Sequence, residues 1–382
     1  MSLALRLTGA EVLRPGGRKA GPLSFAEGRI VEDRPGLREV DLRSYMILPG
    51  IVDIHGDGFE RHLAPRRGAM KDLSLGLRAA EAEIAAGGIT TAVLAQFYSW
   101  EGGMRGPEFA ERVFAAIGAL RDQVASTLLT QLRFEIPMLE DYGAVADMVA
   151  RHGIGYVVFN DHLPHDELEK GKRPKRLTGQ ALRIGRNPEK HLEFMQGLHA
   201  RMGEVPAALD GLIEALVARG VRLGSHDDKT ASERETWRAR GVGIAEFPET
   251  AEAVEAAHLG GDAVIMGAPN VVRGGSHNGN ASAAEAVMMG YVDALASDYH
   301  YPSLRRAAFL LADGGVCDLA TAWGLISAGP ARVLGLTDRG TILPGQRADL
   351  VVMEPKSRAI CATLSGGRVS YMSGDVAARF VG

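Results

Sequence analysis

Cysteine is scarce in this chain, since only Cys317 and Cys361 occur among its 382 residues. They show no C-x-x-C spacing, which excludes a disulfide framework and fits a reducing compartment. Both stand in apolar surroundings, and we expect them to be packed free thiols. A chain of this length also buries enough apolar surface to fold without disulfides or a structural metal.

The chain also lacks a strong charge of one sign and any long apolar run. Its formal net charge of -4 argues against general nucleic-acid binding. No apolar stretch reaches membrane-spanning length, and the N-terminus leads into an alternating segment rather than a signal-like one. Hydrophobic residues at 46% and charged residues at 24% suggest neither disorder nor a fibrous architecture. We therefore expect a cytoplasmic globular protein that binds neither nucleic acid nor membrane.

Apolar strand-like runs alternate with alanine-rich amphipathic stretches from residue 47 onward. This alternation is the signature of repeated βα units around a parallel sheet. Eight strands are predicted, at residues 51–54, 90–94, 127–135, 155–160, 221–225, 244–247, 263–266 and 294–297. Helices are predicted between them, for example at residues 73–86, 108–124, 206–219 and 251–258. Eight such units over about 290 residues match a closed (β/α)8 TIM-type barrel.

Both ends of the chain have a different pattern. The first 47 residues hold short alternating runs broken by glycine and proline, without a helix of useful length. Strand-like runs return after Gly340, at residues 348–353 and 367–372. We expect residues 1–47 and 340–382 to pair into one small β-sandwich domain beside a barrel of residues 48–339.

Metal-binding residue types end five of the predicted strands. Catalytic residues of such barrels lie at the C-terminal ends of the strands. After the first strand, alternation places His55 and Asp57 on the same side, so both can reach one ion. Imidazoles and carboxylates at these strand ends suit one or two divalent ions such as Zn, Mn or Fe. The predicted ligands are His55, Asp57, Glu135, His162, His226 and Asp298, with Glu135 as the bridging carboxylate.

Two longer motifs resemble those of a known superfamily. Residues 48–55, LPGIVDIH, resemble the entry motif of the amidohydrolase superfamily, and residues 340–352, GTILPGQRADLVV, resemble its closing strand. Together they bracket nearly the whole chain. Superfamily members usually carry His-x-His at the first strand, whereas this chain has Asp57 at the second position. A carboxylate tolerates harder ions than imidazole does, which leaves metal identity and number open.

Four further stretches are similar to a narrower family. They are residues 225–228 (SHDD), 244–250 (IAEFPET), 266–280 (MGAPNVVRGGSHNGN) and 297–299 (SDY). These resemble the PhnM-type enzymes of the carbon-phosphorus lyase pathway, the α-D-ribose 1-methylphosphonate 5-triphosphate diphosphatases. The resemblance implies a metal-dependent hydrolase of phosphonate catabolism, which cleaves a phosphoanhydride of that ribose triphosphate and releases pyrophosphate.

The glycine-rich part of this match favours anion binding on its own chemistry. Glycines let backbone N–H groups approach an anion closely, and an arginine offers a planar fork for phosphate. The predicted substrate-binding residues here are Arg273, Gly274, Gly275, Ser276, His277 and Asn280. The alternative is an ordinary glycine-rich barrel loop with an arginine on its rim.

Two basic segments are further candidates for phosphate contacts. Arg61 and Arg66 follow the first strand closely and could clamp a triphosphate, although a solvated charged face is the ordinary explanation. Glu60 beside them is an alternative metal ligand. Residues 170–176 carry five Lys or Arg in seven positions. They could form a mobile lid over the polyphosphate, but we favour a solvated loop.

These residues predict a hydrolytic mechanism. Metal ions would lower the pKa of a bound water, which would attack a phosphorus atom of the triphosphate. Asp298, as the resemblance implies, would accept the proton of that water. Arg273 and neighbouring backbone amides would stabilise charge on the phosphoryl oxygens.

Two other functions stay open at this stage. An ordinary amidohydrolase acting on an N-acyl amino acid or a cyclic amide would use the same metals and Asp298. A catalytically silent assembly subunit would show eroded ligands, which this chain does not. The expected partner is a small phosphorylated ribose substrate, and the expected assembly is a homo-oligomer.

Overall fold

Eight parallel strands form the central sheet of the computed structural model, which describes residues 2–64, 72–274 and 281–381. Neighbouring strands all pair in parallel and follow one another in chain order. They are β8 (Ile51–Gly56), β9 (Ile89–Tyr98), β10 (Thr127–Glu135), β11 (Tyr156–Asn160), β12 (Arg222–His226), β13 (Ile244–Glu246), β14 (Ala263–Gly267) and β15 (Ala294–Ala296).

The first and last of these strands meet and close the sheet. Asp298 N–H donates to the His55 carbonyl, and Asp57 N–H donates to the Asp298 carbonyl, both at 3.0 Å. At the same seam the buried Asp53 carboxylate accepts hydrogen bonds from the Ser297 N–H (3.0 Å) and hydroxyl (2.6 Å). The predicted (β/α)8 TIM-type barrel is therefore confirmed.

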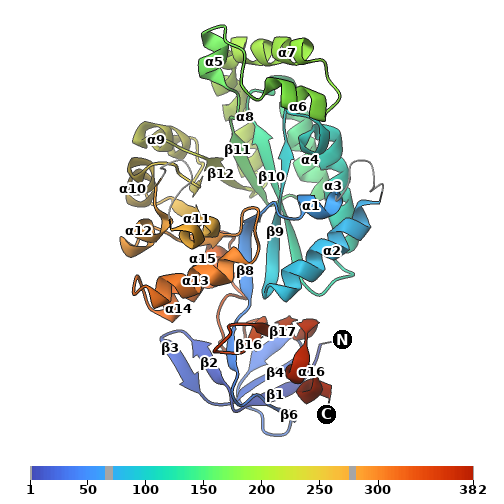
Figure 1. The fold of residues 1–382 in the computed structure, drawn as a ribbon, viewed down its shortest axis with the longest axis vertical. Coiled ribbons are helices and arrows are strands. Elements are labelled where there is room, and N and C mark those ends of the chain that lie inside the picture. Colours follow the sequence, from blue (N-terminus) through green and yellow to red (C-terminus); the bar gives the residue numbers. More distant parts are fainter. Residues whose placement is uncertain (1, 65–71, 275–280, 382) are drawn as a thin grey trace.

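Helices cover the outside of the barrel (Figure 1). Because helices pack on one side and the barrel core on the other, most strand residues are buried, which explains their continuous apolar runs. The helices that link successive strands are α1 (Glu60–Leu63), α2 (Leu73–Ala86), α3 (Pro107–Leu120), α4 (Tyr142–His152), α8 (Val205–Val217), α9 (Ala231–Ala239), α10 (Ala251–Leu259), α11 (Ala268–Arg273) and α12 (Ala283–Met288). After β15 come α13 (Ser303–Asp313), α14 (Leu319–Gly324) and α15 (Ala328–Val333), and short 3-10 turns occur at η1 (Gly103–Arg105) and η2 (Leu139–Asp141). In the described part of the chain, no helix is both long and apolar enough to cross a membrane.

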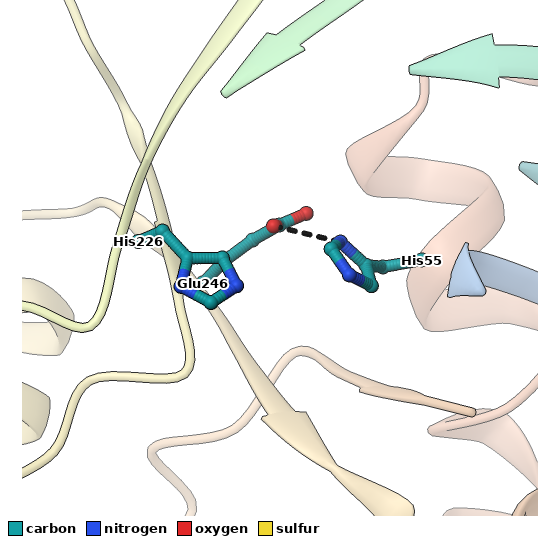
Figure 2. A group of neighbouring side chains, drawn as sticks. All are labelled: His55, His226 and Glu246. Atoms are coloured by element: carbon teal, nitrogen blue, oxygen red, sulfur yellow. Dashed lines mark ion pairs between the residues drawn. The ribbon is translucent and has the colours of Figure 1, made fainter. Parts of the chain in front are cut away.

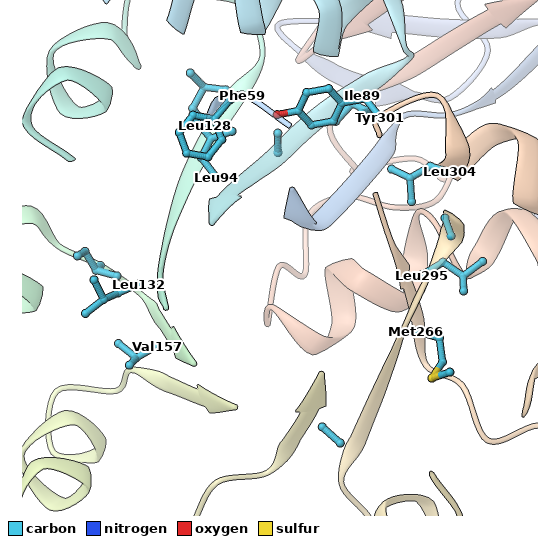
Figure 3. Close-up of a cluster of buried hydrophobic side chains, with 14 of the residues drawn as sticks. Phe59, Ile89, Leu94, Leu128, Leu132, Val157, Met266, Leu295, Tyr301 and Leu304 are labelled. Atoms are coloured by element: carbon cyan, nitrogen blue, oxygen red, sulfur yellow. The ribbon is translucent and has the colours of Figure 1, made fainter. Parts of the chain in front are cut away.

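Two apolar layers hold the barrel together. Between sheet and helices lie fully buried side chains such as Leu132 and Val157 (Figure 3). Inside the barrel, Val52, Ile54 and Val158 belong to a second cluster. Each fully buried side chain of this kind contributes about 1.5–3 kcal/mol. These layers provide the rigid frame on which the strand ends are placed.

The connection from β11 to β12 adds three helices above the barrel: α5 (His165–Glu169), α6 (Leu177–Arg183) and α7 (Pro188–Ala200), followed by the 3-10 turn η3 (Met202–Glu204). The basic segment at residues 170–176 lies between α5 and α6. Pro174 and Leu177 are buried, so the chain is anchored on both sides of Lys175 and Arg176.

Both ends of the chain form two further sheets, seen as the blue and red elements of Figure 1. One has the strand order β5-β4-β1-β6 and the other β18-β17-β16-β7-β2-β3. The strands are β1 (Leu5–Thr8), β2 (Glu11–Arg14), β3 (Gly17–Ala20), β4 (Leu23–Ala26), β5 (Arg29–Val31), β6 (Arg38–Asp41), β7 (Met46–Pro49), β16 (Leu350–Met353), β17 (Ile360–Ser365) and β18 (Arg368–Met372), and α16 (Gly374–Val381) follows them.

The two sheets are joined by one apolar core and by pairing between the chain ends. Residues from both ends, among them Leu5, Phe25, Leu350 and Leu364, belong to one buried cluster. Strand β16 runs antiparallel to β7, so the C-terminal segment lies against the N-terminal one. A β-sandwich built from both chain ends was predicted and is present, while the domain division at residues 47 and 340 stays a prediction.

Candidate metal centre and active site

Side chains that can bind a metal ion gather at the C-terminal ends of the barrel strands. Among the described residues, three groups have ligand atoms within 4.8 Å of one another: His55 with His226 and Glu246, His162 with His226 and Asp227, and His55 with Asp57 and Asp298. His55 and His226 each belong to two groups, so the three form one continuous cluster. The cluster brings together five of the six predicted ligands, whose binding of metal stays a prediction.

Glu246, at the end of β13, is the carboxylate of the first group (Figure 2). Its Oε2 lies 2.9 Å from His55 Nδ1. Its Oε1 accepts hydrogen bonds from the Tyr156 hydroxyl and the Gln131 amide, both at 2.6 Å. Burial alone raises the pKa of Glu246, but the His55 and His226 imidazoles outweigh it and hold this pKa below its ordinary value. Glu246 is therefore an ionised carboxylate at neutral pH.

Several buried atoms of this group have no hydrogen bond within the described part of the chain. They are both ring nitrogens of His55, Nδ1 of His226 and Oε2 of Glu246. His55 Nδ1 and Glu246 Oε2 are thus close enough for an ion pair, but their geometry is not that of a hydrogen bond. Buried polar atoms are costly unless a partner satisfies them. Imidazole nitrogens with carboxylate oxygens are a donor set for zinc, manganese and iron, so these residues fit a divalent ion.

Arg133 on β10 lies inside the cluster. Its Nη2 donates to His226 Nε2 at 2.9 Å, and its Nη1 donates to Asp57 Oδ2 at 3.3 Å. The guanidinium also stacks 3.8 Å from the centre of the Phe97 ring. Because arginine only donates, His226 Nε2 must be unprotonated, and burial lowers the pKa of His226 accordingly. A fixed positive charge therefore stands among the candidate ligands.

Glu135, at the end of β10, holds the His162 imidazole in place. Its Oε1 accepts a hydrogen bond from His162 Nδ1, and its Oε2 accepts from the His162 N–H (3.0 Å) and the Trp100 indole (3.2 Å). Burial lowers the pKa of His162, but Asp227 and Glu135 outweigh it and raise this pKa to about 9. Within the described residues, Glu135 is in none of the three groups. Its bridging role stays a prediction.

Asp298 follows β15 with a φ of 56°, in the left-handed region. Asp227 of the cluster shares this conformation, with a φ of 62°. Such backbone strain costs about 1–3 kcal/mol for a non-glycine residue and gathers at active sites. Burial and the neighbouring Asp57 carboxylate raise the pKa of Asp298 to about 6. A carboxyl group with a pKa near neutrality is suited to accept and release a proton.

A buried arginine fixes the segment that carries His226. Arg234 of α9 donates to Asp228 at 3.0 Å, to Asp262 at 2.7 Å and to the Ser225 hydroxyl. The Arg234 side chain is fully buried, and both carboxylates are 3% exposed. The pairing ties the end of β12 to α9 and to the start of β14, which orients the ligands that follow.

Two cavities meet at the cluster and share Arg133, His226, Asp227 and Asp298. The larger has a volume of about 540 Å³, and its wall includes the cationic residues Arg105, Lys175 and Arg176. The smaller has a volume of about 280 Å³, and its wall includes Phe247, Asn270 and Arg273. Part of the basic segment thus faces the candidate site.

The predicted substrate-binding residues lie in different places. Arg273 is the last residue of α11, lines the smaller cavity and donates to the Tyr299 hydroxyl. Gly274 follows with a φ of 75°, a conformation that favours glycine. Arg61 is held by the Glu83 carboxylate and the Tyr299 carbonyl, and in the described structure it lines neither cavity. Outside the described residues lie Arg66, Gly275, Ser276, His277 and Asn280.

Three central residues escaped the sequence analysis as candidates: Glu246, Arg133 and Asp227, which follows the predicted ligand His226 directly. Glu246 ends a predicted strand, so the strand-end rule that selected Asp298 could have found it. Arg133 stands two residues before Glu135, where alternation along a strand places both side chains on one side. Glu60, the alternative ligand, is in none of the three described groups, while burial and Asp57 raise its pKa to about 7.

Comparison with known proteins places the chain among hydrolases. No protein-family model matches it. It is 32% identical over 353 residues to the α-D-ribose 1-methylphosphonate 5-triphosphate diphosphatase of Escherichia coli. The match covers 89% of this chain and 93% of the relative.

Solved structures share the fold over nearly the whole chain. The β-aspartyl dipeptidase of Fervidobacterium islandicum superposes with a TM-score of 0.61 at 15% identity, covering 98% of this chain and 99% of that one. The N-acetylglucosamine-6-phosphate deacetylase of Pasteurella multocida gives 0.62 at 11% identity, covering 96% and 99%. The N-acyl-D-glutamate deacylase of Bordetella bronchiseptica, a zinc complex, gives 0.62 at 15% identity, covering 97% of each. At these identities the likeness shows the fold alone.

The diphosphatase relative shares sequence along almost its full length, and the dipeptidase and deacylase structures share the fold. The chain is therefore a hydrolase that belongs to the α-D-ribose 1-methylphosphonate 5-triphosphate diphosphatase family.

Proposed function

We propose that this hydrolase converts α-D-ribose 1-methylphosphonate 5-triphosphate into α-D-ribose 1-methylphosphonate 5-phosphate and pyrophosphate. One water is consumed, because its oxygen bonds to phosphorus while the anhydride bond between the first and second phosphoryl groups breaks. The name of the relative supplies the substrate. We infer a cytoplasmic enzyme of phosphonate catabolism that works with one or two Zn, Mn or Fe ions.

The buried guanidinium of Arg133 is the observation that carries this proposal. It contacts Asp57 and His226, which belong to different ligand groups, at 3.3 and 2.9 Å. Phosphoryl transfer depends on cations beside the reacting phosphorus, and a guanidinium fork pairs well with phosphoryl oxygens. An N-acyl amino acid has one carboxylate and needs one such cation, whereas Arg133 stands within the cluster and further cations line both cavities. The site is therefore better suited to a polyphosphate than to an amide.

The roles of the remaining residues follow from their positions. A divalent ion bound here would activate water and neutralise phosphoryl charge. The Asp298 carboxylate would take the proton of the attacking water and release it to product or solvent. Arg273 would pair with an oxygen of the departing pyrophosphate from the smaller cavity. The residues that would hold metal are His55, Asp57, His162, His226, Asp227, Glu246 and Asp298.

Phosphorus NMR of the purified protein with the ribose triphosphate tests this function. We expect pyrophosphate as the released anion and no orthophosphate. Arg133→Met should lower the rate at least about 100-fold, as loss of a charge-stabilising donor does. Arg121→Met, which changes an exposed arginine after α3, is the matched control and should keep the rate.

An amidohydrolase acting on an N-acyl amino acid or a cyclic amide is the alternative, because the similar structures include a deacylase and a dipeptidase. Incubation with N-acyl amino acids under the same conditions separates the two functions. Turnover of these substrates without pyrophosphate release from the triphosphate would favour the alternative.

A further inference from the structure

A basic basin adjoins the larger cavity on the side away from Arg273. It has a volume of about 440 Å³, and four of its seven wall residues are cationic: Arg105, Lys175, Arg176 and Arg183. Glu101 is its acidic wall residue, and it already accepts a hydrogen bond from Arg105 at 3.1 Å. The basin is continuous with the ligand cluster because Arg105, Lys175 and Arg176 also line the larger cavity.

Three of the four cations of this basin have no acidic partner among the described residues, and Arg105 is paired with Glu101. Lys175, Arg176 and Arg183 have no ion pair or side-chain hydrogen bond with any described residue. Arg105 stacks its guanidinium 4.2 Å from the centre of the Phe97 ring, which holds it at the wall. Glu167, the other acid at the margin, lines the larger cavity but not the basin. Three unpaired cations around one hollow create a positive potential that attracts an anion.

Lys175 and Arg176, two of the five cationic residues of the basic segment, stand on an anchored stretch of backbone. Pro174 and Leu177, on either side of Lys175 and Arg176, are buried, and Leu177 is 0% exposed. Lys175 and Arg176 are themselves exposed, and both line the larger cavity. The backbone that carries these side chains is therefore fixed at the wall of the cavity, which lowers the entropy cost of binding.

The substrate of the proposed function has anionic groups at both ends, and the two cavities differ in size. Pyrophosphate is the smaller fragment and fits the 280 Å³ cavity beside Arg273. The ribose with its second anionic group is the larger fragment and needs the 540 Å³ cavity. This arrangement places the group attached to C1 of the ribose at the basin.

We propose that four basin residues form a specificity site for the C1 methylphosphonate of the substrate: Arg105, Lys175, Arg176 and Arg183. This inference rests on the proposed function. The site selects sugar triphosphates with a second anion at C1 over those with a neutral group there. The triphosphate lies across the ligand cluster toward Arg273.

A pair of substrates tests the site: the ribose 1-methylphosphonate 5-triphosphate and a methyl riboside 5-triphosphate, whose C1 group is neutral. Selectivity is the ratio of kcat/KM for the first to that for the second. Lys175→Ala and Arg176→Ala should each lower this ratio about tenfold, and the double variant about 100-fold, because each removes a charge-assisted contact. Lys172→Ala, in the same segment but lining neither cavity nor basin, should leave the ratio unchanged.

Equal losses on both substrates would overturn the proposal, because the cations would then bind the triphosphate. An unchanged ratio in the double variant would overturn it as well. If the wild-type protein releases no pyrophosphate from either compound, the proposed function fails, and calorimetry with ribose 1-methylphosphonate still decides the inference. Weaker binding by the double variant than by wild type supports the anion site, and equal binding refutes it.

Discussion

Replacing Asp298 with asparagine should raise the stability of the protein while it removes activity. Burial and Asp57 raise the pKa of Asp298 to about 6 from an ordinary value of 3.8. In the unfolded chain the carboxyl therefore loses its proton at a lower pH than in the folded protein. Stability from this group is fully present below pH 4 and is lost as the pH rises through about 6.

The size of this effect follows from the separation of the two pKa values. About two pKa units correspond to about 3 kcal/mol at pH 7 and above. Asparagine keeps the shape of the side chain and carries no charge at any pH. After chelation of metal, Asp298→Asn should therefore be more stable than wild type by up to about 3 kcal/mol at pH 8, and equal to it at pH 4.

Urea denaturation of both proteins at the two pH values measures this difference. Asp147→Asn, at an exposed position of α4, is the control and should show no pH-dependent gain. The same Asp298→Asn variant should lose at least about 100-fold in kcat, because it cannot accept a proton. If the variant is less stable than wild type at pH 8, the ionised Asp298 carboxylate does not destabilise the folded protein. That result would refute the reasoning.

Three further substitutions probe the cluster and its support. Glu246→Gln should lower metal content in elemental analysis, because it removes the carboxylate charge beside His55, and full metal content would contradict its place among the ligands. His226→Asn should also lower metal content and abolish turnover, and wild-type values for both would show that the strand-end assignment is wrong. Arg234→Met should lower the free energy of unfolding by about 3–5 kcal/mol, because it leaves Asp228 buried without its partner. A loss below about 1 kcal/mol in urea denaturation would contradict that estimate.

The barrel could be predicted because parallel strands buried on both faces leave long apolar runs. The predicted strand at residues 127–135 and helix at residues 73–86 have the bounds that the structure shows. The predicted strand at residues 90–94 was too short, because Gln96 interrupts the apolar run. In the structure β9 continues to Tyr98, and the Gln96 side-chain nitrogen donates to the carbonyls of Phe97 and Met104. A polar residue with local partners does not end a strand.

The site could be predicted only as far as strand ends reveal it. Their places at strand ends indicate that His55 and Asp298 converge, since the C-terminal ends of all eight strands lie on one face of the barrel. They do not show which neighbours pair: Arg133 and His226 are 93 positions apart, and Glu135 meets His162 from another strand. Nor could the charge pattern of residues 170–176 show which cations face solvent. That depends on how α5 to α7 pack, and only the apolar neighbour Leu177 hints at it.

Charge balance connects the carboxylates of the cluster with the cations around it. Asp57, Asp227, Glu246 and Asp298 bring four carboxyl groups to one barrel mouth. Two like charges 4 Å apart repel by about 4 kcal/mol near a protein surface, so such a cluster alone would reject a triphosphate. Arg133 supplies a positive charge within the cluster, and bound divalent ions would supply more. A donor set rich in carboxylates is therefore compatible with a polyphosphate only because cationic residues line the cavities around it.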